Sequence, residues 1–227
     1  MTTSPSRSTT AALIAALALA ACSSAASPGP QTSAQPASVD RGEGAAIAKA
    51  RADSARHPYT RADVDFMSHM IGHHAQALVM AGWAPSHGAS SSIRILAERI
   101  VNGQQDEIAS MQRWLRNRRQ PAPYPEAPNM SMPMHSHGHA QEHLMPGMLS
   151  ETQMKELDQA RGREFDRLFL TYMIQHHQGA VTMVRDLFGT PGAARDESVF
   201  KLASDISADQ STEIARMQQM LAAVPSR

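Results

Sequence analysis

Two segments of the chain combine paired histidines with methionines at the same spacing. They are FMSHMIGHHAQALVMA at 66–81 and FLTYMIQHHQGAVTMV at 169–184. The second segment repeats the first 103 residues later, and the shift aligns His73 with His176, His74 with His177, Met70 with Met173 and Met80 with Met183. Imidazole binds copper(II), zinc or nickel, and thioether sulfur binds copper(I). The internal repeat therefore predicts an approximately two-fold fold whose repeated residues suit a soft metal ion.

A second group of candidate ligands lies between the two repeats. The segment 120–149 is rich in proline, histidine and methionine. Its candidate metal ligands are Met130, Met132, Met134, His135, His137, His139 and His143, and Met145 and Met148 follow them. Methionine has little reason to accumulate in a segment that is not expected to build a core, so the pattern favours capture of copper or another soft metal ion. The alternative is a solvated linker, and the lack of thiols excludes a structural zinc finger.

Capping and breaking residues delimit the helices that carry these side chains. Four long helices are predicted at about 60–82, 90–117, 163–188 and 196–223. Ser150 and Gln153 form a capping-box pattern that predicts a further short helix. No alternating β-branched run competes, so the predicted class is all-α. The expected architecture is a four-helix bundle of two repeated helical hairpins, with the His/Met-rich insert as a long crossover.

Helical-wheel placement, at about 100 degrees per residue, separates the two histidines of each pair. His74 and His177 fall in the middle of the apolar faces of their helices. His73 and His176 fall on the flanks, where Met80 and Met183 also project. The other two long helices have apolar faces interrupted by Gln104, Glu107, Gln210 and Glu213. Because buried ionisable groups are costly without partners, we expect His74, His177, Glu107 and Glu213 to meet inside the bundle.

Two interpretations of this polar cluster stay open. It is either a set of histidine–carboxylate hydrogen bonds that fixes helix register, or a metal site. Both repeats contain adjacent histidines, with Met70 and Met173 one helical turn away. These residues support the metal interpretation as strongly as the structural one. Methionine alone is weak support, because it commonly fills cores.

The N-terminal segment is typical of a bacterial lipoprotein. Arg7 precedes the apolar run 11–21, which is too short to span a bilayer. The run ends in Leu-Ala-Ala-Cys, so 1–21 is predicted to be a signal peptide and Cys22, the only cysteine, the lipidated residue. The segment 22–57 is predicted to be a flexible tether with a marginal helix. The folded part is then 58–224, made of repeat one (58–119), the insert (120–149) and repeat two (150–224).

Composition narrows the function further. The 227 residues include 21 basic and 21 acidic ones, without a basic stripe, so no nucleic-acid partner is expected. The length suits one well-packed domain or two small ones. With one cysteine the chain forms no internal disulfide, and its stability has to come from packing.

The two repeats resemble a known family. TRADVDFMSHMIGHHAQALVMA and EFDRLFLTYMIQHHQGAVTMV are each followed by a helix with the pattern Gln-x-x-Glu-Ile-x-x-Met, at 104–111 and 210–217. These motifs, over about 58–223, are similar to those of the domain of unknown function 305 family. The resemblance implies a ferritin-like fold, an extracytoplasmic location and copper handling, since the family includes copper-binding members associated with copper resistance.

The main hypothesis is a lipid-anchored protein of the cell envelope that binds copper, as Cu(I) or Cu(II), and buffers or delivers it. Zinc or another transition metal is the alternative ligand. A different class is a metal-dependent oxidoreductase with a buried two-metal centre, and a third is a metal-free envelope adaptor. The repeat helices lack the Glu-x-x-His motif of di-iron bundles, which favours a binding protein over an enzyme. A homo-oligomer and a delivery partner are left open by the sequence.

Overall fold

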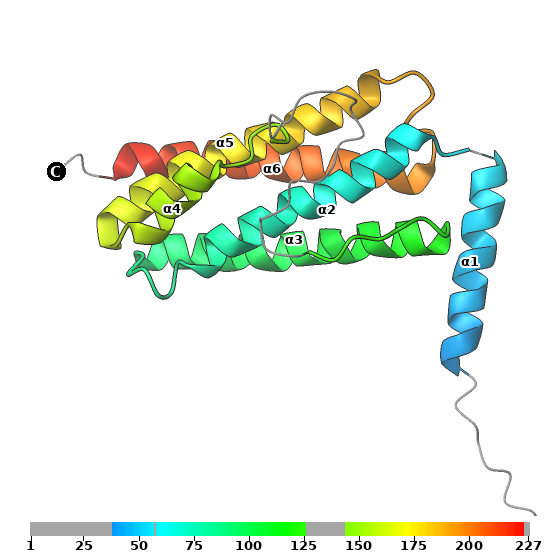
Figure 1. The fold of residues 1–227 in the computed structure, drawn as a ribbon, viewed down its shortest axis with the longest axis horizontal. Coiled ribbons are helices and arrows are strands. Elements are labelled where there is room, and N and C mark those ends of the chain that lie inside the picture. Colours follow the sequence, from blue (N-terminus) through cyan, green and yellow to red (C-terminus); the bar gives the residue numbers. More distant parts are fainter. Residues whose placement is uncertain (1–37, 57, 126–143, 225–227) are drawn as a thin grey trace, which may run out of the picture. The chain divides into compact units, whose positions relative to one another are not determined.

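The computed structural model describes residues 38–56, 58–125 and 144–224, and these ranges form helices and no strands. The helices are α1 (Ser38–Arg56), α2 (Arg61–Gly82), α3 (Ser91–Asn117), α4 (Glu151–Gln159), α5 (Gly162–Gly189) and α6 (Glu197–Ala223) (Figure 1). The predicted all-α class is confirmed for this part of the chain. The predicted signal peptide and Cys22 fall in a separate unit, Met1–Ala37, which lies outside the described residues.

Helices α2 and α4 both begin at capping boxes, of which the sequence predicts the one at Ser150 and Gln153. The Thr60 side chain accepts a hydrogen bond from the Asp63 backbone N–H, and the Asp63 carboxylate accepts one from the Thr60 backbone N–H. Ser150 and Gln153 make the same reciprocal pair at the start of α4. Such pairs satisfy backbone donors that a helix start otherwise leaves without partners.

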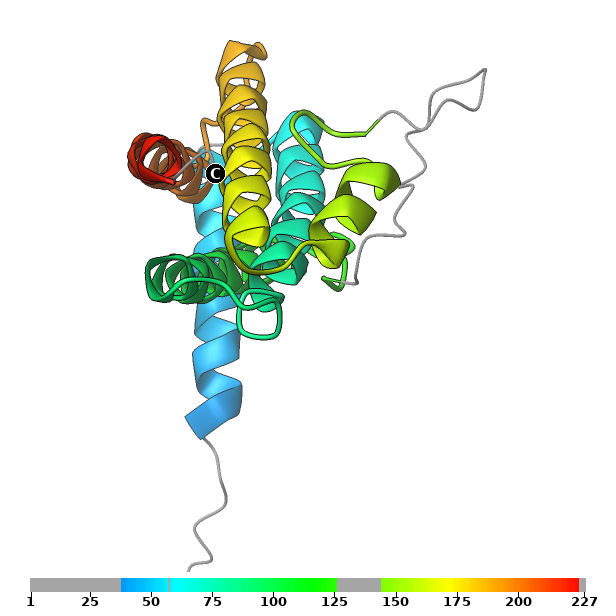
Figure 2. The ribbon, with the colours of Figure 1, turned by 90° about the vertical axis from the view of Figure 1, so that its left-hand side faces the viewer.

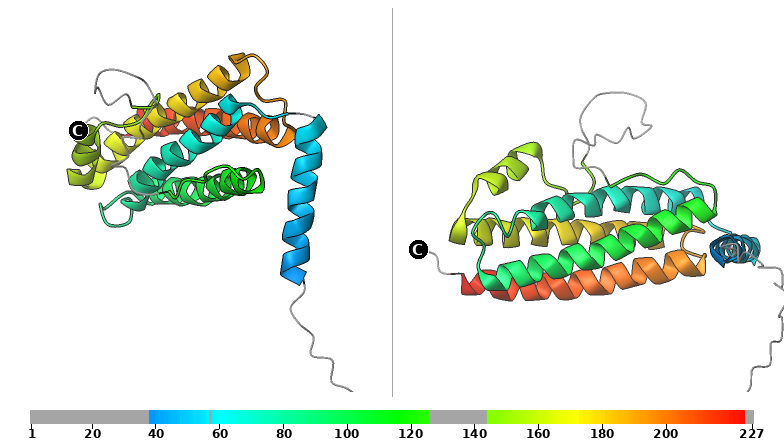
Figure 3. Two further views of the ribbon diagram at one scale, coloured as in Figure 1. Left: turned by 45° about the vertical axis from the view of Figure 1, so that its right-hand side comes forward. Right: turned by 90° about the horizontal axis from the view of Figure 1, so that it is seen from below.

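Four helices form two antiparallel hairpins, which we call the two-hairpin unit. Helices α2 and α3 pack along each other, as do α5 and α6, and the hairpins meet where α2 runs beside α5. Figure 2 shows α3 and α6 nearly end-on with α2 and α5 beside them, and α4 on the side of α2 and α5 away from α6. Figure 3 shows α2 and α5 side by side from two further directions. The first helices of the two repeats therefore lie against each other.

The first turn of α2 and the first turns of α5 each carry an aspartate that accepts a hydrogen bond from the loop of the opposite hairpin. Asp63 of α2 is fully buried, and its carboxylate accepts a 2.7 Å hydrogen bond from the Ala194 backbone N–H. Asp166 of α5, the repeat equivalent of Asp63, accepts from the Ser90 backbone N–H at 3.1 Å. The repeat thus builds reciprocal attachments between the two hairpins.

A buried ion pair joins α3 to the start of α6. The Asp196 carboxylate accepts hydrogen bonds from the Trp114 indole at 3.1 Å and from the Arg118 guanidinium at 2.5 Å, and it also caps α6. The Arg118 guanidinium lies 4.4 Å from the Trp114 ring centre, over its face. Removal of either charge would leave its partner buried without compensation, which is a strongly destabilising change.

The buried apolar side chains form two clusters that lie toward opposite ends of the two-hairpin unit. The first includes Ala77, Met80, Ile93, Leu96, Ile100, Phe165, Phe169, Met173 and Met217. The second includes Phe66, Met67, Met70, Ile71, Ile108, Met111, Ala180, Val184, Val199 and Ile206. Between the two clusters each long helix carries buried or partly buried polar side chains, so a polar layer crosses the middle of the core.

Two segments differ from the sequence-based boundaries. Helix α1 occupies much of the predicted tether, so its alanine-rich composition does form a helix. The end of the predicted insert also joins the core, since Met148 and Leu149 are buried. The Leu149 backbone N–H donates to the Gln76 side chain at 2.7 Å, and the Gln76 amide donates back to the Leu149 carbonyl at 3.0 Å. In the described ranges, no helix has the length and apolar content needed to cross a membrane.

Candidate metal centre

The polar layer contains two polar side chains from each of the four long helices. They are His73 and His74 of α2, Gln104 and Glu107 of α3, His176 and His177 of α5, and Gln210 and Glu213 of α6. All four histidines are fully buried, and both glutamines are nearly so. The predicted insert ligands Met130, Met132, Met134, His135, His137, His139 and His143 lie outside the described residues.

Each central histidine is hydrogen-bonded to a glutamate of its own hairpin, so the four residues expected to meet in the bundle form two separate pairs rather than one cluster. The His74 Nε2 atom lies 2.6 Å from the Glu107 carboxylate. The repeat gives the equivalent pair, with His177 Nε2 at 2.7 Å from the Glu213 carboxylate. The glutamate side chains are 17% and 22% exposed, so they connect buried imidazoles to the surface. A carboxylate in this position fixes the tautomer and orientation of the ring.

The flank histidines, by contrast, lie deeper than a flank position suggests. The His73 and His176 rings are both fully buried between α2 and α5, and their centres are 3.9 Å apart. His73 Nε2 lies 3.0 Å from the Pro146 carbonyl oxygen, and His176 Nε2 lies 3.0 Å from the His73 carbonyl oxygen. The flank is buried because α2 packs against α5 as well as α3, which widens its covered face.

Burial keeps the facing pair, His73 and His176, neutral. Loss of hydration, reinforced by the adjacent His74, lowers the pKa of His73 from 6.5 to about 3. Burial and the facing His73 lower the pKa of His176 well below its ordinary value. A neutral imidazole carries its proton on one nitrogen only, and carbonyl acceptors at Nε2 require that proton there. The Nδ1 atoms of His73 and His176 therefore present free lone pairs.

Buried polar atoms without a hydrogen-bond partner concentrate in this layer. In the described part of the chain, nine buried side-chain nitrogen and oxygen atoms have no partner, and eight belong to the layer. These eight are Nδ1 of His73, His74, His176 and His177, together with both amide atoms of Gln104 and of Gln210. Each such atom costs about 1–3 kcal/mol if it stays unpaired. Four of these atoms are imidazole nitrogens, so the hydrogen bonds of the described residues do not satisfy the layer completely.

Thioether groups flank the layer. Met70, Met80 and Met173 are fully buried, whereas Met183 is half-buried. Met70 precedes His74 by four residues, and Met173 precedes His177 by four, so each pair shares a helix face. Neutral imidazole with thioether is a donor set that suits copper(I). Within the described ranges, no three His, Cys, Asp or Glu side chains gather closely enough to hold a metal ion on their own.

Carboxylates line the outer edge of the layer. Asp209 of α6 is an exposed side chain whose pKa is raised, first by partial desolvation and then by the negative charges of Glu107, Asp205 and Glu213. The acids of α3 and α6 therefore act on one another across the two hairpins. A negative potential at this edge favours the approach of cations.

Some site residues escape sequence reasoning. The sequence does mark Gln104 and Gln210, which interrupt apolar faces, but it does not show that their buried amides have no hydrogen-bond partner. The Pro146 carbonyl carries no side-chain signature at all, although the Pro146–Gly147 dipeptide does predict a turn. Gln76 lies within the first repeat, and only the structure pairs it with Leu149.

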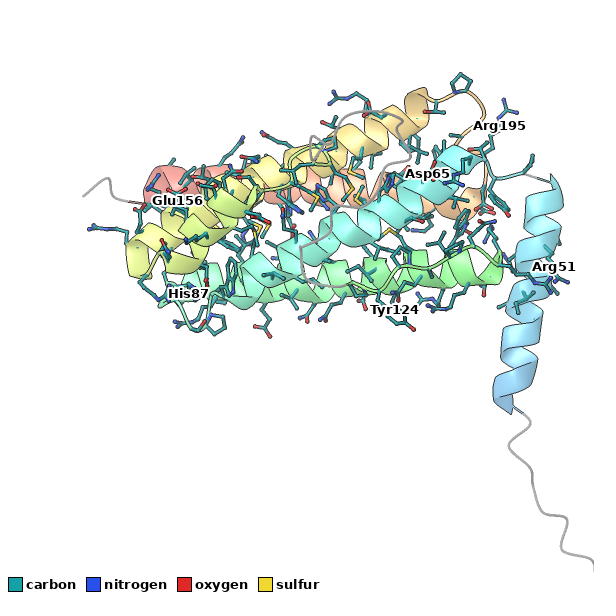
Figure 4. All side chains as sticks on the ribbon, in the orientation of Figure 1. Arg51, Asp65, His87, Tyr124, Glu156 and Arg195 are labelled. Atoms are coloured by element: carbon teal, nitrogen blue, oxygen red, sulfur yellow. The ribbon has the colours of Figure 1, made fainter. Side chains whose placement is uncertain are left out.

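His87 shows what a structural histidine looks like in this protein. Its Nε2 donates to the Asp158 carbonyl at 2.8 Å, and its Nδ1 lies 2.9 Å from the Ser86 hydroxyl. Figure 4 places His87 and Glu156 at the same end of the two-hairpin unit. Both ring nitrogens of His87 are satisfied, in contrast to the four histidines of the layer.

Two hairpins joined across a layer of histidine pairs define an all-helical protein with a buried nitrogen-rich site. The family model described as domain of unknown function (DUF305) matches residues 63–221. The chain belongs to the DUF305 family. A search of curated proteins gives no match.

Solved structures agree with this assignment. A DUF305 fragment from Deinococcus radiodurans is 31% identical, with a TM-score of 0.59, and the alignment covers 73% of this chain and 98% of that one. A DUF305 protein from Streptomyces coelicolor is 27% identical, with a TM-score of 0.57 and coverages of 71% and 92%. CopM in its Cu(I)-bound form is 30% identical, with a TM-score of 0.52 and coverages of 70% and 94%.

Proposed function

We propose that this protein binds copper on the outer side of the cell membrane and buffers or delivers it. The observation that carries the proposal is the set of four buried imidazoles with unpaired Nδ1 atoms. Two of the rings are held at Nε2 by carboxylates and two by backbone carbonyls. Histidines that bind metal ions commonly use one ring nitrogen as the ligand, while the other nitrogen donates to a carboxylate or a carbonyl that orients the ring.

The comparisons support copper as the ligand. The similar protein CopM has been crystallised with Cu(I), with Cu(II) and with silver. Silver resembles Cu(I) in its preference for soft donors, and Met70 and Met173 are buried thioether donors one helical turn before His74 and His177. In this proposal the two-hairpin unit is a ferritin-like four-helix bundle. Its layer would be the ordered copper site, and the His/Met-rich insert would capture ions.

The proposed location rests on the N-terminal sequence. Residues 1–21 have the pattern of a lipoprotein signal peptide, and Cys22 is the lipidation residue of the proposal. A similar DUF305 protein, that of Streptomyces coelicolor, is described as secreted. The protein would then act from a lipid anchor on the periplasmic or cell-surface side. Radioactive palmitate incorporation into the wild type and into a Cys22→Ser variant tests the anchor, and equal incorporation would refute it.

Metal titration tests the copper proposal. Mature protein is titrated with Cu(I) and with Cu(II), alongside a variant with His73, His74, His176 and His177 changed to glutamine. A second variant has the insert ligands at 130–143 changed to serine. We expect the first variant to lose the tight sites and the second to keep them. Unchanged stoichiometry and affinity in the first variant would remove the buried layer from the proposal.

A further inference from the structure

The turn Met145–Met148 places a backbone carbonyl against the buried layer. The Met148 backbone N–H donates to the Met145 carbonyl at 3.1 Å, and Gly147 has a positive φ of 75°. Proline followed by a glycine of positive φ is the pattern of a type II turn. Pro146 is exposed to solvent on its outer side, while its carbonyl oxygen lies 3.0 Å from His73 Nε2.

Two glycines allow this turn to dock on α5. A Cβ atom at Gly179 would collide with the carbonyl group of Pro146. A Cβ atom at Gly147 would lie 2.5 Å from the Gln175 carbonyl oxygen. Both obstacles are backbone atoms, so no side chain can rotate to make room. The Gln175 amide also donates to the Gly147 carbonyl at 3.3 Å.

A second attachment fixes the turn to α2. The buried Gln76 side chain makes two hydrogen bonds with the backbone of Leu149, which directly follows the turn. Gln76 lies three residues after His73 on the same helix. The turn is therefore held on both α2 and α5, which carry His73 and His176, and its Pro146 carbonyl is directed at His73.

We propose that the turn is a positioning element for metal binding at His73, and that the Pro146 carbonyl is the positioning group. The carbonyl accepts the Nε2 proton, which leaves the lone pair on Nδ1 facing the layer. Without this acceptor the fully buried ring would have no partner that favours one tautomer over the other. This inference rests on the proposed function, in which copper binds at the histidine layer.

A single methyl group tests the inference. Gly179→Ala adds a Cβ atom where the Pro146 carbonyl lies, and it leaves every histidine and methionine in place. Alanine also favours helix more than glycine does, so the change does not weaken α5 itself. Gly189→Ala is the matched control, because it is on the same helix and its Cβ atom would meet nothing within 4 Å. Both changes are made in full-length chain whose insert ligands at 130–143 are replaced by serine.

Two measurements are made on each variant. Two-bond 1H–15N spectra of the metal-free protein report which nitrogen of His73 carries the proton. Competition with a chromogenic Cu(I) chelator then gives the affinity for Cu(I). We expect the wild type and Gly189→Ala to show the Nε2–H tautomer. Gly179→Ala should show a mixture of tautomers and about 10–100-fold weaker Cu(I) binding.

A folded Gly179→Ala variant that keeps the Nε2–H tautomer, or keeps wild-type Cu(I) affinity, would overturn the inference. If Gly179→Ala does not fold, Gly147→Ala displaces the same turn from the loop side and is judged by the same two measurements. If the chain with serine at the insert ligands and no glycine substitution binds no Cu(I), the proposed function is refuted instead. The metal-free tautomer would then still decide whether the turn positions His73.

Discussion

Acidification from about pH 7 to about pH 5 is expected to destabilise the metal-free protein, because His73 is buried and neutral. Burial, with a contribution from His74, lowers the pKa of His73 from 6.5 to about 3. In the unfolded chain the same ring keeps a pKa of about 6.5. Between these values the unfolded state binds a proton that the folded state does not, so the free energy of unfolding falls as the pH falls. The loss begins below about pH 6.5 and ends near pH 3.

The size of the effect follows from this difference in pKa. One proton changes the free energy of unfolding by about 1.4 kcal/mol per pH unit, so His73 alone costs about 2 kcal/mol between pH 7 and pH 5. His176, whose pKa is also lowered by burial, acts in the same direction. Because domains are commonly stable by only about 5–15 kcal/mol, the loss is easily measured.

Urea unfolding of the metal-free full-length chain at about pH 7, pH 6 and pH 5 measures this loss. His73→Gln is the comparison, because glutamine does not titrate and its amide can still donate to the Pro146 carbonyl. The variant should lose about 2 kcal/mol less than the wild type over this range. Equal pH dependence of the two proteins would show that His73 titrates normally and would refute the argument from burial.

Three further substitutions give distinct results. Glu107→Gln should weaken Cu(I) binding about 10–100-fold in chelator competition, since it removes the carboxylate that orients His74; wild-type affinity would deny that role. Met173→Leu should change the free energy of unfolding by less than about 1.5 kcal/mol yet weaken Cu(I) binding, and equal Cu(I) affinity would show that this sulfur is not a ligand. Asp196→Ala should lower the free energy of unfolding in urea by about 3–5 kcal/mol because Arg118 stays buried without its partner, and a loss below about 1 kcal/mol would contradict this.

Local rules predict the helices and one half of the site. The side chains of Thr60 and Ser150 mark helix starts within a few residues, because capping depends only on near neighbours in the chain. Each central histidine meets a glutamate, as at His74 and Glu107, because an apolar face fixes which way its polar interruptions point. These features need no knowledge of how the hairpins pack.

The other half of the site depends on packing that the sequence does not reveal. A helical wheel places His73 on a flank, but only the approach of α5 covers that flank and brings the His176 ring against it. The Pro146 carbonyl is a backbone group, so no residue type announces it. Its position depends on contact with Gly179, which lies 33 residues further along the chain.

Long-range 1H–15N spectra, taken before and after Cu(I) is added to the full-length protein, test the central claim most directly. Cu(I) is diamagnetic, so the histidine ring nitrogens stay observable. Copper binding in the layer should shift the Nδ1 resonances of the buried histidines while their Nε2 atoms stay protonated. Nδ1 resonances that do not move at saturating Cu(I) would contradict the claim that this layer is the copper site.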